Sequence, residues 1–343
     1  MDANMNHRTL GDVGAVSEVG YGSWQIGSDW GDVSESEAVE AVEAARDAGI
    51  DFFDTADVYG DGRSERILGD VLDADIASDD VTVATKAGRR LDPHVADGYD
   101  EANLRRFVDR SRENLGVETL DLVQLHCPPT DVYYRPETFD ALETLADEGR
   151  IANYGVSVER VEEGLKAIAY PGVESVQIIF NPFRQRPAEL FLEEAAARGV
   201  GVICRVPLAS GLLTGALSRD SDFPEDDHRN YNREGDAFDV GETFAGVPYE
   251  VGLDAADALG ERVDAVAEDP SDATGDDLSL PQLSLRWILD HEAVSTVIPG
   301  STTPKHVRAN AAASDLTPLD EADRRAVADV YEEFVREHVH QRW

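Results

Sequence analysis

Positive charge is scarce in this chain of 343 residues, and lysine is almost absent. Lys and Arg number 30 against 70 Asp and Glu, the formal net charge is −40, and only Lys86, Lys166 and Lys305 are lysines. This charge excludes nonspecific binding to nucleic acid or to an anionic membrane. Because the acidic residues are spread along the whole chain, we expect a halophilic protein, whose surface charges are screened by salt.

Cysteine and long apolar segments are scarce as well. Cys127 and Cys204 are the only cysteines, too few for a disulfide scaffold, which indicates a reducing compartment. No apolar run reaches the roughly 18 residues that can span a membrane, and the first residues carry no apolar core of a signal peptide. The sequence therefore predicts a soluble, cytoplasmic protein with no membrane partner.

Two common nucleotide-binding motifs and a metal motif are missing too. Neither G-x-G-x-x-G nor G-x-x-x-x-G-K occurs, so nothing supports a Rossmann or P-loop site. No spacing of His and Cys residues supports a closed metal site, and we expect no bound metal.

Short apolar runs alternate with segments whose apolar residues recur every three to four positions. The runs predict strands at 17–21, 51–54, 81–85, 120–126, 151–156, 175–179, 201–206 and 294–298. The segments between them predict helices at 34–48, 64–72, 100–115, 136–147, 159–168, 187–198, 280–290 and 304–312. Eight such alternations predict an α/β fold, a single (β/α)₈ TIM barrel that occupies residues 1–343.

Additional segments surround this repeat. Residues 8–16 predict a β-hairpin that covers the floor of the barrel. The polar segment 216–248 follows the seventh strand as a long loop, and we expect it to fold over the catalytic face. Residues 249–268 predict a helix, 269–277 an acidic linker, and 320–340 a C-terminal helix on the barrel exterior.

Four ionisable side chains of four types lie at or just beyond the ends of predicted strands. Asp54, Lys86 and His126 end the second, third and fourth strands. Tyr59 lies in the loop after the second strand. Because the carboxyl ends of barrel strands meet at one face, where active sites are built, we expect the four to share a site.

These residue types indicate acid catalysis on a carbonyl. A tyrosine donates a proton readily near neutral pH only if a nearby cation lowers its pKa from about 10. Lys86 and His126 are the candidates for lowering the Tyr59 pKa. Asp54 would keep Lys86 charged, because a buried ammonium without a counter-ion tends to lose its proton. His126 would orient the carbonyl.

Each of these residues also has an ordinary interpretation. Asp54 could cap a helix, and Tyr59 could fill a loop. Lys86 could extend to water, and His126 could be a satisfied core histidine. Their joint occurrence at one face of the barrel favours the shared site. Surface positions or helix ends are assigned to Arg135, His228, His291, His338 and His340.

The segments that carry these residues resemble a known family. Residues 54–60 (DTADVYG), 84–88 (ATKAG) and 121–128 (DLVQLHCP) are similar to the Asp, Tyr, Lys, His tetrad segments of the aldo-keto reductase superfamily, in the same order. The resemblance covers about residues 8 to 315 and also includes the segments 150–157, 176–182, 207–215 and 297–301. It implies a TIM barrel that reduces an aldehyde or ketone with a nicotinamide cofactor, as in the bacterial and archaeal branch.

The resemblance also implies how the cofactor binds, extended across the barrel mouth. Ser157 and Gln177 would bond the carboxamide, and residues 207–215 would cradle the pyrophosphate. The implied cofactor-binding residues are Gly22, Ser23, Trp24, Asp54, Ser157, Gln177, Arg205, Pro207, Leu208, Gly211, Leu213, Gly215, Ile298, Gly300, Ser301, Lys305, Arg308 and Asn310. Trp24 and Trp30 would form a substrate wall beside Tyr59 and His126.

Two departures from the family pattern concern the nicotinamide. Ser157 is followed by Val158, where the family usually has Asn, so one carboxamide donor is missing. Arg205 stands where many members stack a tyrosine on the ring. Because a guanidinium would repel an oxidised, cationic ring, we expect Arg205 to reach the pyrophosphate and to disfavour that ring.

A third departure concerns the coenzyme. Gly300 replaces a lysine that grips the 2′-phosphate, and His306 replaces an arginine. Ser301, Lys305 and Arg308 remain near, and a dianionic phosphate needs concentrated positive charge. We therefore expect NADP, with NAD as the alternative.

Two other functions stay open at this point. The same fold in potassium-channel β-subunits binds NADP and regulates a partner with little turnover. A barrel lyase or aldolase would use Lys86 as a Schiff-base amine. For a reductase, we expect a small polar or sugar-like carbonyl substrate; the sequence leaves the oligomeric state open.

Overall fold

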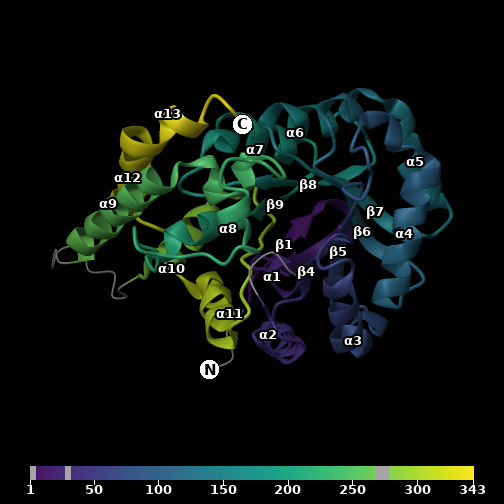
Figure 1. Ribbon diagram of the computed structural model, residues 1–343, viewed down its shortest axis with the longest axis horizontal. Helices are drawn as coiled ribbons and strands as arrows, with labels where there is room; N and C mark the ends of the chain where they lie inside the picture. Colours follow the sequence, from purple (N-terminus) through teal and green to yellow (C-terminus); the bar gives the residue numbers. More distant parts are fainter. Residues whose placement is uncertain (1–4, 28–31, 268–277) are drawn as a thin grey trace.

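The computed structural model describes residues 5–27, 32–267 and 278–343 (Figure 1). Its centre is an eight-stranded parallel sheet in which the strands follow one another in chain order. These strands are β3 (Tyr21–Gly22), β4 (Phe52–Asp54), β5 (Thr82–Ala87), β6 (Leu120–His126), β7 (Ile151–Ser157), β8 (Val173–Ile179), β9 (Gly201–Arg205) and β10 (Thr296–Val297). A parallel bridge between Val19 and Val297 joins the first and last strands, which closes the barrel.

Helices follow the strands and lie outside them (Figure 1). They are α2 (Glu35–Asp47), α3 (Arg63–Ala77), α4 (Glu101–Leu115), α5 (Pro136–Asp147), α6 (Val161–Ala167), α7 (Phe191–Ala197), α10 (Leu280–Leu289) and α11 (Pro304–Ala311). Local sequence sets several of their starts: Ser34 and Glu37 form a capping box, and the Asp100 side chain accepts from the Asn103 backbone N–H. The predicted alternation and the TIM barrel are confirmed.

The barrel floor is covered by the predicted hairpin, formed by β1 (His7–Leu10) and β2 (Gly14–Ser17). Leu10 and Val16 pack against Phe52 and Leu122 in a small apolar cluster inside the barrel. The predicted first strand at 17–21 overlaps the barrel strand, because Val19 already bridges Val297; only its first residue, Ser17, pairs with His7 in the hairpin.

The remaining helices pack on the exterior. Helix α9 (Tyr249–Ala267) contacts α12 (Glu321–Val330). A π-helical turn at Tyr331–Val335 joins α12 to α13 (Arg336–Val339), so the predicted C-terminal helix is one helical segment with a wider turn inside it. The predicted linker 269–277 lies outside the described residues.

The long segment after β9 has more structure than its polar composition indicates. It contains a short helix, α8 (His228–Tyr231), and two 3₁₀ turns at Val240–Glu242 and Phe244–Gly246. His228 and Phe244 are buried. In the described parts of the chain, no helix is long and apolar enough to cross a membrane.

Candidate active site

The strand ends bring the four predicted catalytic residues together. Asp54 ends β4 and pairs in register with Ala84, two residues before Lys86 on β5. His126 ends β6, and Tyr59 lies in the turn before α3. Asp54, Tyr59 and His126 line one cavity of about 600 Å³, and Lys86 lies directly behind them.

Lys86 is held by three oxygen atoms in a dry environment. Its side chain is 1% exposed, and its Nζ donates to Asp54 Oδ1 at 2.5 Å and to the Thr55 carbonyl at 2.8 Å. The third contact is the Tyr59 hydroxyl, at 3.5 Å. Burial lowers the pKa of Lys86, and the charge of Asp54 opposes that shift. The Asp54 carboxylate also accepts from Gln177 Nε2 at 2.6 Å, which completes its hydrogen bonding.

The Tyr59 phenol is a neutral donor in this structure. We predicted that Lys86 and His126 lower its pKa, and this prediction is wrong. Burial raises the pKa of Tyr59 well above 10, and the negative charges of Asp54 and Glu242 add to the rise. The hydroxyl therefore keeps its proton throughout the neutral range.

The His126 imidazole lies edge-on to the Tyr59 ring, with the ring centroids 6.0 Å apart. Its Nδ1 is buried and has no hydrogen-bond partner among the described residues. Burial, followed by the charges of Arg89 and Lys86, lowers the pKa of His126 well below 6.5. A neutral imidazole at this position can donate a hydrogen bond to a substrate oxygen.

Aromatic side chains close one wall of the cavity. The Trp24 ring stacks on Tyr59, with centroids 6.1 Å apart, and contacts His228 at 4.6 Å. His228 was assigned to a surface or a helix end: it is the first residue of α8, but it is fully buried, because it packs on Trp24 at the barrel mouth. Trp30, the other predicted substrate residue, lies outside the described residues.

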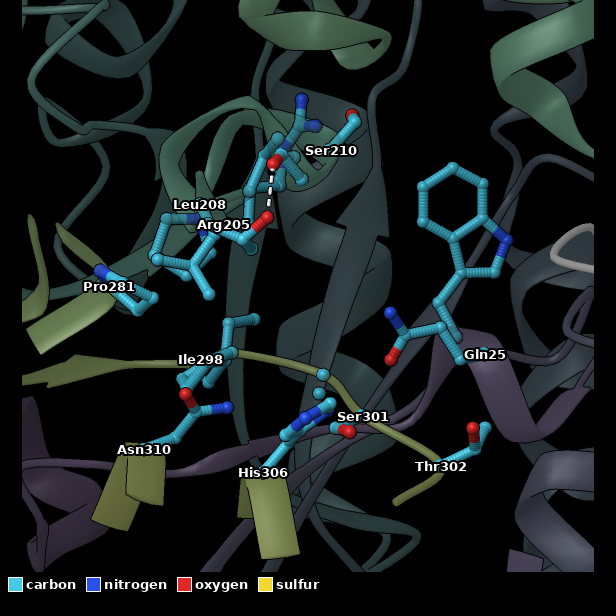
Figure 2. A pocket seen from close by; sticks show the side chains of 18 of the residues that line it. Gln25, Arg205, Leu208, Ser210, Pro281, Ile298, Ser301, Thr302, His306 and Asn310 are labelled. Atoms are coloured by element: carbon cyan, nitrogen blue, oxygen red, sulfur yellow. Dashed lines mark hydrogen bonds between the residues drawn. The ribbon is translucent and has the colours of Figure 1, made fainter. Parts of the chain in front are cut away.

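The same cavity extends as a groove between the ends of β3, β9 and β10, and Figure 2 shows several of the side chains that line it. The predicted cofactor residues that line it are Gly22, Ser23, Trp24, Asp54, Gln177, Arg205, Pro207, Leu208, Gly211, Ile298, Gly300, Ser301 and Asn310. The segment Ala209–Thr214 forms a tight 3₁₀ turn along one side, where Ser210 and Gly211 adopt positive φ.

Two glycines line the floor of the groove at positions where a larger side chain would collide with neighbouring atoms. A Cβ on Gly22 would lie 2.8 Å from the Ile298 carbonyl oxygen, and one on Gly300 would lie 2.4 Å from Gln25 Oε1. Any larger residue at position 300 would thus have to displace Gln25. Gln25 Oε1 is itself buried without a partner in the described part of the chain. It therefore offers an unused acceptor to a polar ligand in the groove.

Five of the predicted cofactor residues do not line the groove. Ser157 Oγ lies 3.5 Å from Cys127 Sγ behind the wall, and Leu213 is buried in the core. Gly215 follows the tight turn with positive φ. Lys305 and Arg308 are exposed on α11, one helical turn apart and near the pocket residue His306.

We predicted that Arg205 extends along the groove to the pyrophosphate. Instead, two carboxylates hold its guanidinium. Its Nη2 lies 3.0 Å from Glu159, and its Nη1 lies 3.5 Å from Glu242. Arg89 pairs with the same two glutamates. Sequence reasoning missed Arg89, Glu159 and Glu242, which carry no motif and lie far apart in the chain.

These carboxylates also approach Cys127 closely enough that the three residues could hold a metal ion. The two arginines already neutralise both carboxylates, however. A cation there would have to displace Arg89 and Arg205, so the arrangement is better suited to ion pairing.

Comparison with known proteins agrees with this geometry. The model of the Aldo/keto reductase family matches residues 18–332. Aldo-keto reductase YhdN of Bacillus subtilis (strain 168) is 28% identical over 340 residues, which cover 98% of this chain and 96% of YhdN.

Solved structures are similar over the same length. The holo form of aldo-keto reductase AKR11C1 from Bacillus halodurans has a TM-score of 0.75 and 26% identity, covering 98% of this chain and 100% of that one. An aldo/keto reductase from Klebsiella pneumoniae in complex with NADP and acetate shares the fold, with a TM-score of 0.67, 22% identity and 95% of each chain covered. The chain belongs to the aldo/keto reductase family and is an NAD(P)-dependent oxidoreductase.

Proposed function

We propose that this protein reduces a small polar aldehyde or ketone to an alcohol, with NADPH as the hydride source and Tyr59 as the proton donor. The observation that carries the proposal is the position of the Tyr59 hydroxyl. It lies 3.5 Å from Lys86 Nζ and beside the His126 ring, in the wall of a cavity that opens into the groove.

The tetrad residues have distinct tasks in this reaction. A bound reduced nicotinamide would supply hydride to the carbonyl carbon. The protonated Tyr59 would donate to the carbonyl oxygen, and Lys86 would stabilise the phenolate that remains. Asp54 holds Lys86 in place through the 2.5 Å contact. The neutral His126 would orient the carbonyl by a hydrogen bond.

The groove residues fit a dinucleotide. Gln25 Oε1 is an unused acceptor near Gly300, and the close backbone approach at Gly22 leaves room for a flat group. Ser157 does not line the groove, so Gln177 is left to bind the carboxamide, although its Nε2 already donates to Asp54. We place the pyrophosphate along Pro207–Gly211.

The choice of NADP rests on charge at the far end of the groove. Lys305 and Arg308 are exposed on α11, which begins three residues after Ser301, and neither makes an ion pair within the described ranges. Most arginines of this acidic chain do pair with carboxylates, so two unpaired cations on one helical face favour a phosphate ligand. NAD remains the alternative that the titration below tests.

The segment 216–248 acts in this proposal as the cover of the active site. Arg229 and Glu242 from this segment line the cavity, and His228 packs on Trp24. Closure of this kind excludes water from the reacting groups. The described contacts therefore favour a site that is closed before the substrate reacts.

The test begins with purified protein in multimolar KCl. NADPH and NADH are titrated while tryptophan fluorescence is followed, and reduction of a panel of small aldehydes and ketones is then measured. We expect saturable quenching by NADPH. Tyr59→Phe should lower turnover by about 10²–10⁴-fold and leave NADPH affinity unchanged. Unchanged turnover in this variant would falsify the role of Tyr59.

Two outcomes would favour the other functions. Tight NADPH binding without turnover of any carbonyl would favour a regulatory module. Trapping of a substrate on Lys86 by borohydride would favour a lyase, although burial and the contact with Asp54 leave the Lys86 amine little freedom to form a Schiff base.

A further inference from the structure

The Arg205 side chain forms part of the cavity wall and is fixed at both of its ends. Its backbone ends β9, and its guanidinium reaches the segments that follow β6 and β7. There Nη2 donates to the Val158 carbonyl oxygen at 3.0 Å and lies 3.5 Å from Cys127 Sγ. Between these two ends, Arg205 lines the cavity that Tyr59 and His126 also line (Figure 2).

Two glutamates hold the guanidinium and balance its charge. Nη2 lies 3.0 Å from Glu159, and Nη1 lies 3.5 Å from Glu242. Arg89 pairs with the same two glutamates, so two arginines match two acidic residues. The Arg205 side chain is only 9% exposed, and protein contacts rather than water set its position. Arg205 is therefore suited to act on a ligand through a directed N–H, not through a net charge.

One donor of this guanidinium is unused. Arg205 Nε is buried and has no hydrogen-bond partner among the residues described. A guanidinium keeps its hydrogens and cannot accept a hydrogen bond, so Nε needs an acceptor. A buried N–H without an acceptor costs free energy, and an exception of this kind indicates a water or a ligand that completes the bond. Because Arg205 lines the cavity, a ligand bound there can supply the acceptor.

The carboxamide of a nicotinamide is a ligand group whose predicted partners are engaged elsewhere. Ser157 does not line the described cavity, and its Oγ lies 3.5 Å from Cys127 Sγ. Gln177 lines the cavity, but its Nε2 donates to Asp54 at 2.6 Å and to Gln124 at 3.5 Å. Both hydrogens of the Gln177 amide are thus used, and the carboxamide oxygen needs another donor.

The reaction places the carboxamide near Arg205. Hydride transfer requires the reacting atoms to approach to about 3–3.5 Å, so the nicotinamide ring must lie beside a carbonyl held by Tyr59 and His126. The carboxamide is attached to the ring carbon next to the one that gives up hydride. Arg205 is also directly followed in the chain by the residues along which we place the pyrophosphate, 207–211.

We propose that Arg205 positions the nicotinamide, with its Nε–H donating to the carboxamide oxygen. The proposal rests on the proposed function and deepens it, since it needs a nicotinamide beside Tyr59. The ion pairs with Glu159 and Glu242 hold the guanidinium, and Nε supplies the contact to the cofactor. A donor that is fixed in advance restricts the orientation of the ring against the Tyr59 hydroxyl. Arg205 therefore serves the nicotinamide and not the pyrophosphate.

Two cofactor analogues test which atom of the carboxamide is recognised. Thio-NADPH carries sulfur in place of the carboxamide oxygen, and sulfur is a weaker acceptor. The 3-acetylpyridine analogue of NADPH keeps the oxygen and has a methyl group in place of the amide nitrogen. The dissociation constants of NADPH and of both analogues are measured by tryptophan quenching in multimolar KCl.

In the wild type, we expect thio-NADPH to bind about tenfold more weakly than NADPH, the size expected for loss of a hydrogen bond from a charged donor. Arg205→Lys keeps a positive charge that can pair with Glu159 but has no N–H at the position of Nε. This variant should bind NADPH about tenfold more weakly and distinguish it from thio-NADPH by less than about twofold. The ratio of the acetylpyridine analogue to NADPH should be the same in both proteins, because that analogue keeps the oxygen.

Arg89→Lys is the matched control, because it makes the same exchange in the other arginine of the ion pairs. Arg89 pairs with Glu159 and Glu242 but does not line the described cavity. The control should leave both analogue ratios as in the wild type. Loosened packing alone would weaken NADPH and thio-NADPH equally, so a changed ratio in Arg205→Lys reports the lost donor.

Equal binding of NADPH and thio-NADPH by the wild type overturns the proposal, and this measurement needs no variant. A folded Arg205→Lys variant that keeps the wild-type ratio overturns it as well. If that variant instead raises the KM of the carbonyl substrate and leaves the thio-NADPH ratio unchanged, the donor serves the substrate and the assignment to the cofactor falls. Failure of the proposed function would look different, because the wild type would then bind none of the three dinucleotides.

Discussion

Two clusters of buried charge flank the same cavity, and they are assembled in different ways. The pair Asp54–Lys86 comes from β4 and β5, which are neighbours in the sheet, and its register follows directly from strand pairing. The second cluster, formed by Arg89, Glu159, Arg205 and Glu242, joins four segments, one of which is the long segment after β9. A local pair can thus be expected from strand ends, whereas the second cluster forms only after the segment 216–248 has folded.

The clusters also differ in charge balance. Lys86 meets one carboxylate, which in turn is bonded by Gln177, so the pair is complete. The second cluster holds two arginines and two glutamates, and each arginine pairs with both glutamates. The pair holds Lys86 beside the Tyr59 hydroxyl, and the second cluster ties the segment 216–248 to the barrel through Glu242.

The largest effect should come from breaking the first cluster with Lys86→Met. Removal of one partner leaves a buried carboxylate uncompensated, which typically costs about 3–5 kcal/mol. We expect a fall of that size in the free energy of unfolding, measured with urea in high salt, and loss of turnover. The double variant Asp54→Asn/Lys86→Met should recover part of the stability. A double variant as unstable as the single one would contradict this account.

Asp57 tests a third situation, a buried carboxylate with no partner. Neither carboxylate oxygen has a hydrogen bond among the residues described, and burial followed by the charge of Glu65 raises the pKa of Asp57 to about 7. Because the unfolded state ionises first, wild-type stability should fall between about pH 4 and 7, by roughly 4 kcal/mol for a shift of this size.

Asp57→Asn removes this titration. The variant should lose that part of the pH dependence, whatever its stability at a single pH. Unfolding curves at pH 4, 5, 6 and 7 measure the slope. An identical slope in the variant and the wild type would mean that Asp57 does not titrate in this range.

Trp343 packs next to the second cluster without belonging to it, so replacing Trp343 tests whether this packing holds Glu242 in place. Its indole donates to Asp239 at 2.9 Å, and Arg184 lies 4.0 Å above its ring. Its ring also packs against Gly241 and Gly246, next to Glu242. Trp343→Ala should cost about 3 kcal/mol, the low end for a buried aromatic residue, and should speed NADPH release in stopped-flow fluorescence. Trp343→Phe should retain most of the packing.

The smallest effect is expected at the surface. Arg105 and Arg150 both bond Glu148, whose pKa they lower to about 2, but all three side chains are well hydrated. Glu148→Gln should leave the urea midpoint in multimolar KCl unchanged. A clear fall in the urea midpoint of Glu148→Gln at high salt would contradict the expectation that exposed ion pairs contribute little to stability.

The order of strands and helices was predictable because apolar periodicity reports which face of each element is covered. The strand end at Asp54 and the helix start after Ser34 need only local sequence. The first barrel strand was predicted one residue too long at its start, because Ser17 belongs to the preceding hairpin, whereas Val19 and Tyr21 pair in the barrel. Nothing in the local pattern separates the two.

The site was predictable in part for the same reason. Asp54, Lys86 and His126 could be expected at one face, since strand ends in a barrel converge there. The partners of Arg205 could not, because Glu159 and Glu242 lie 46 and 37 residues away in sequence and belong to no repeated pattern. The burial of His228 could not be predicted either, since it depends on how the segment 216–248 packs on Trp24.

The sequence alone therefore determined the barrel, its catalytic face and the residues that meet there, because strand alternation and strand order are local properties. Only the tertiary structure decided the rise of the Tyr59 pKa and the pairing of Arg205. These depend on how much water remains around each group and on which distant charges face it. Dehydration and long-range contacts arise when the whole chain packs, and no single segment contains them.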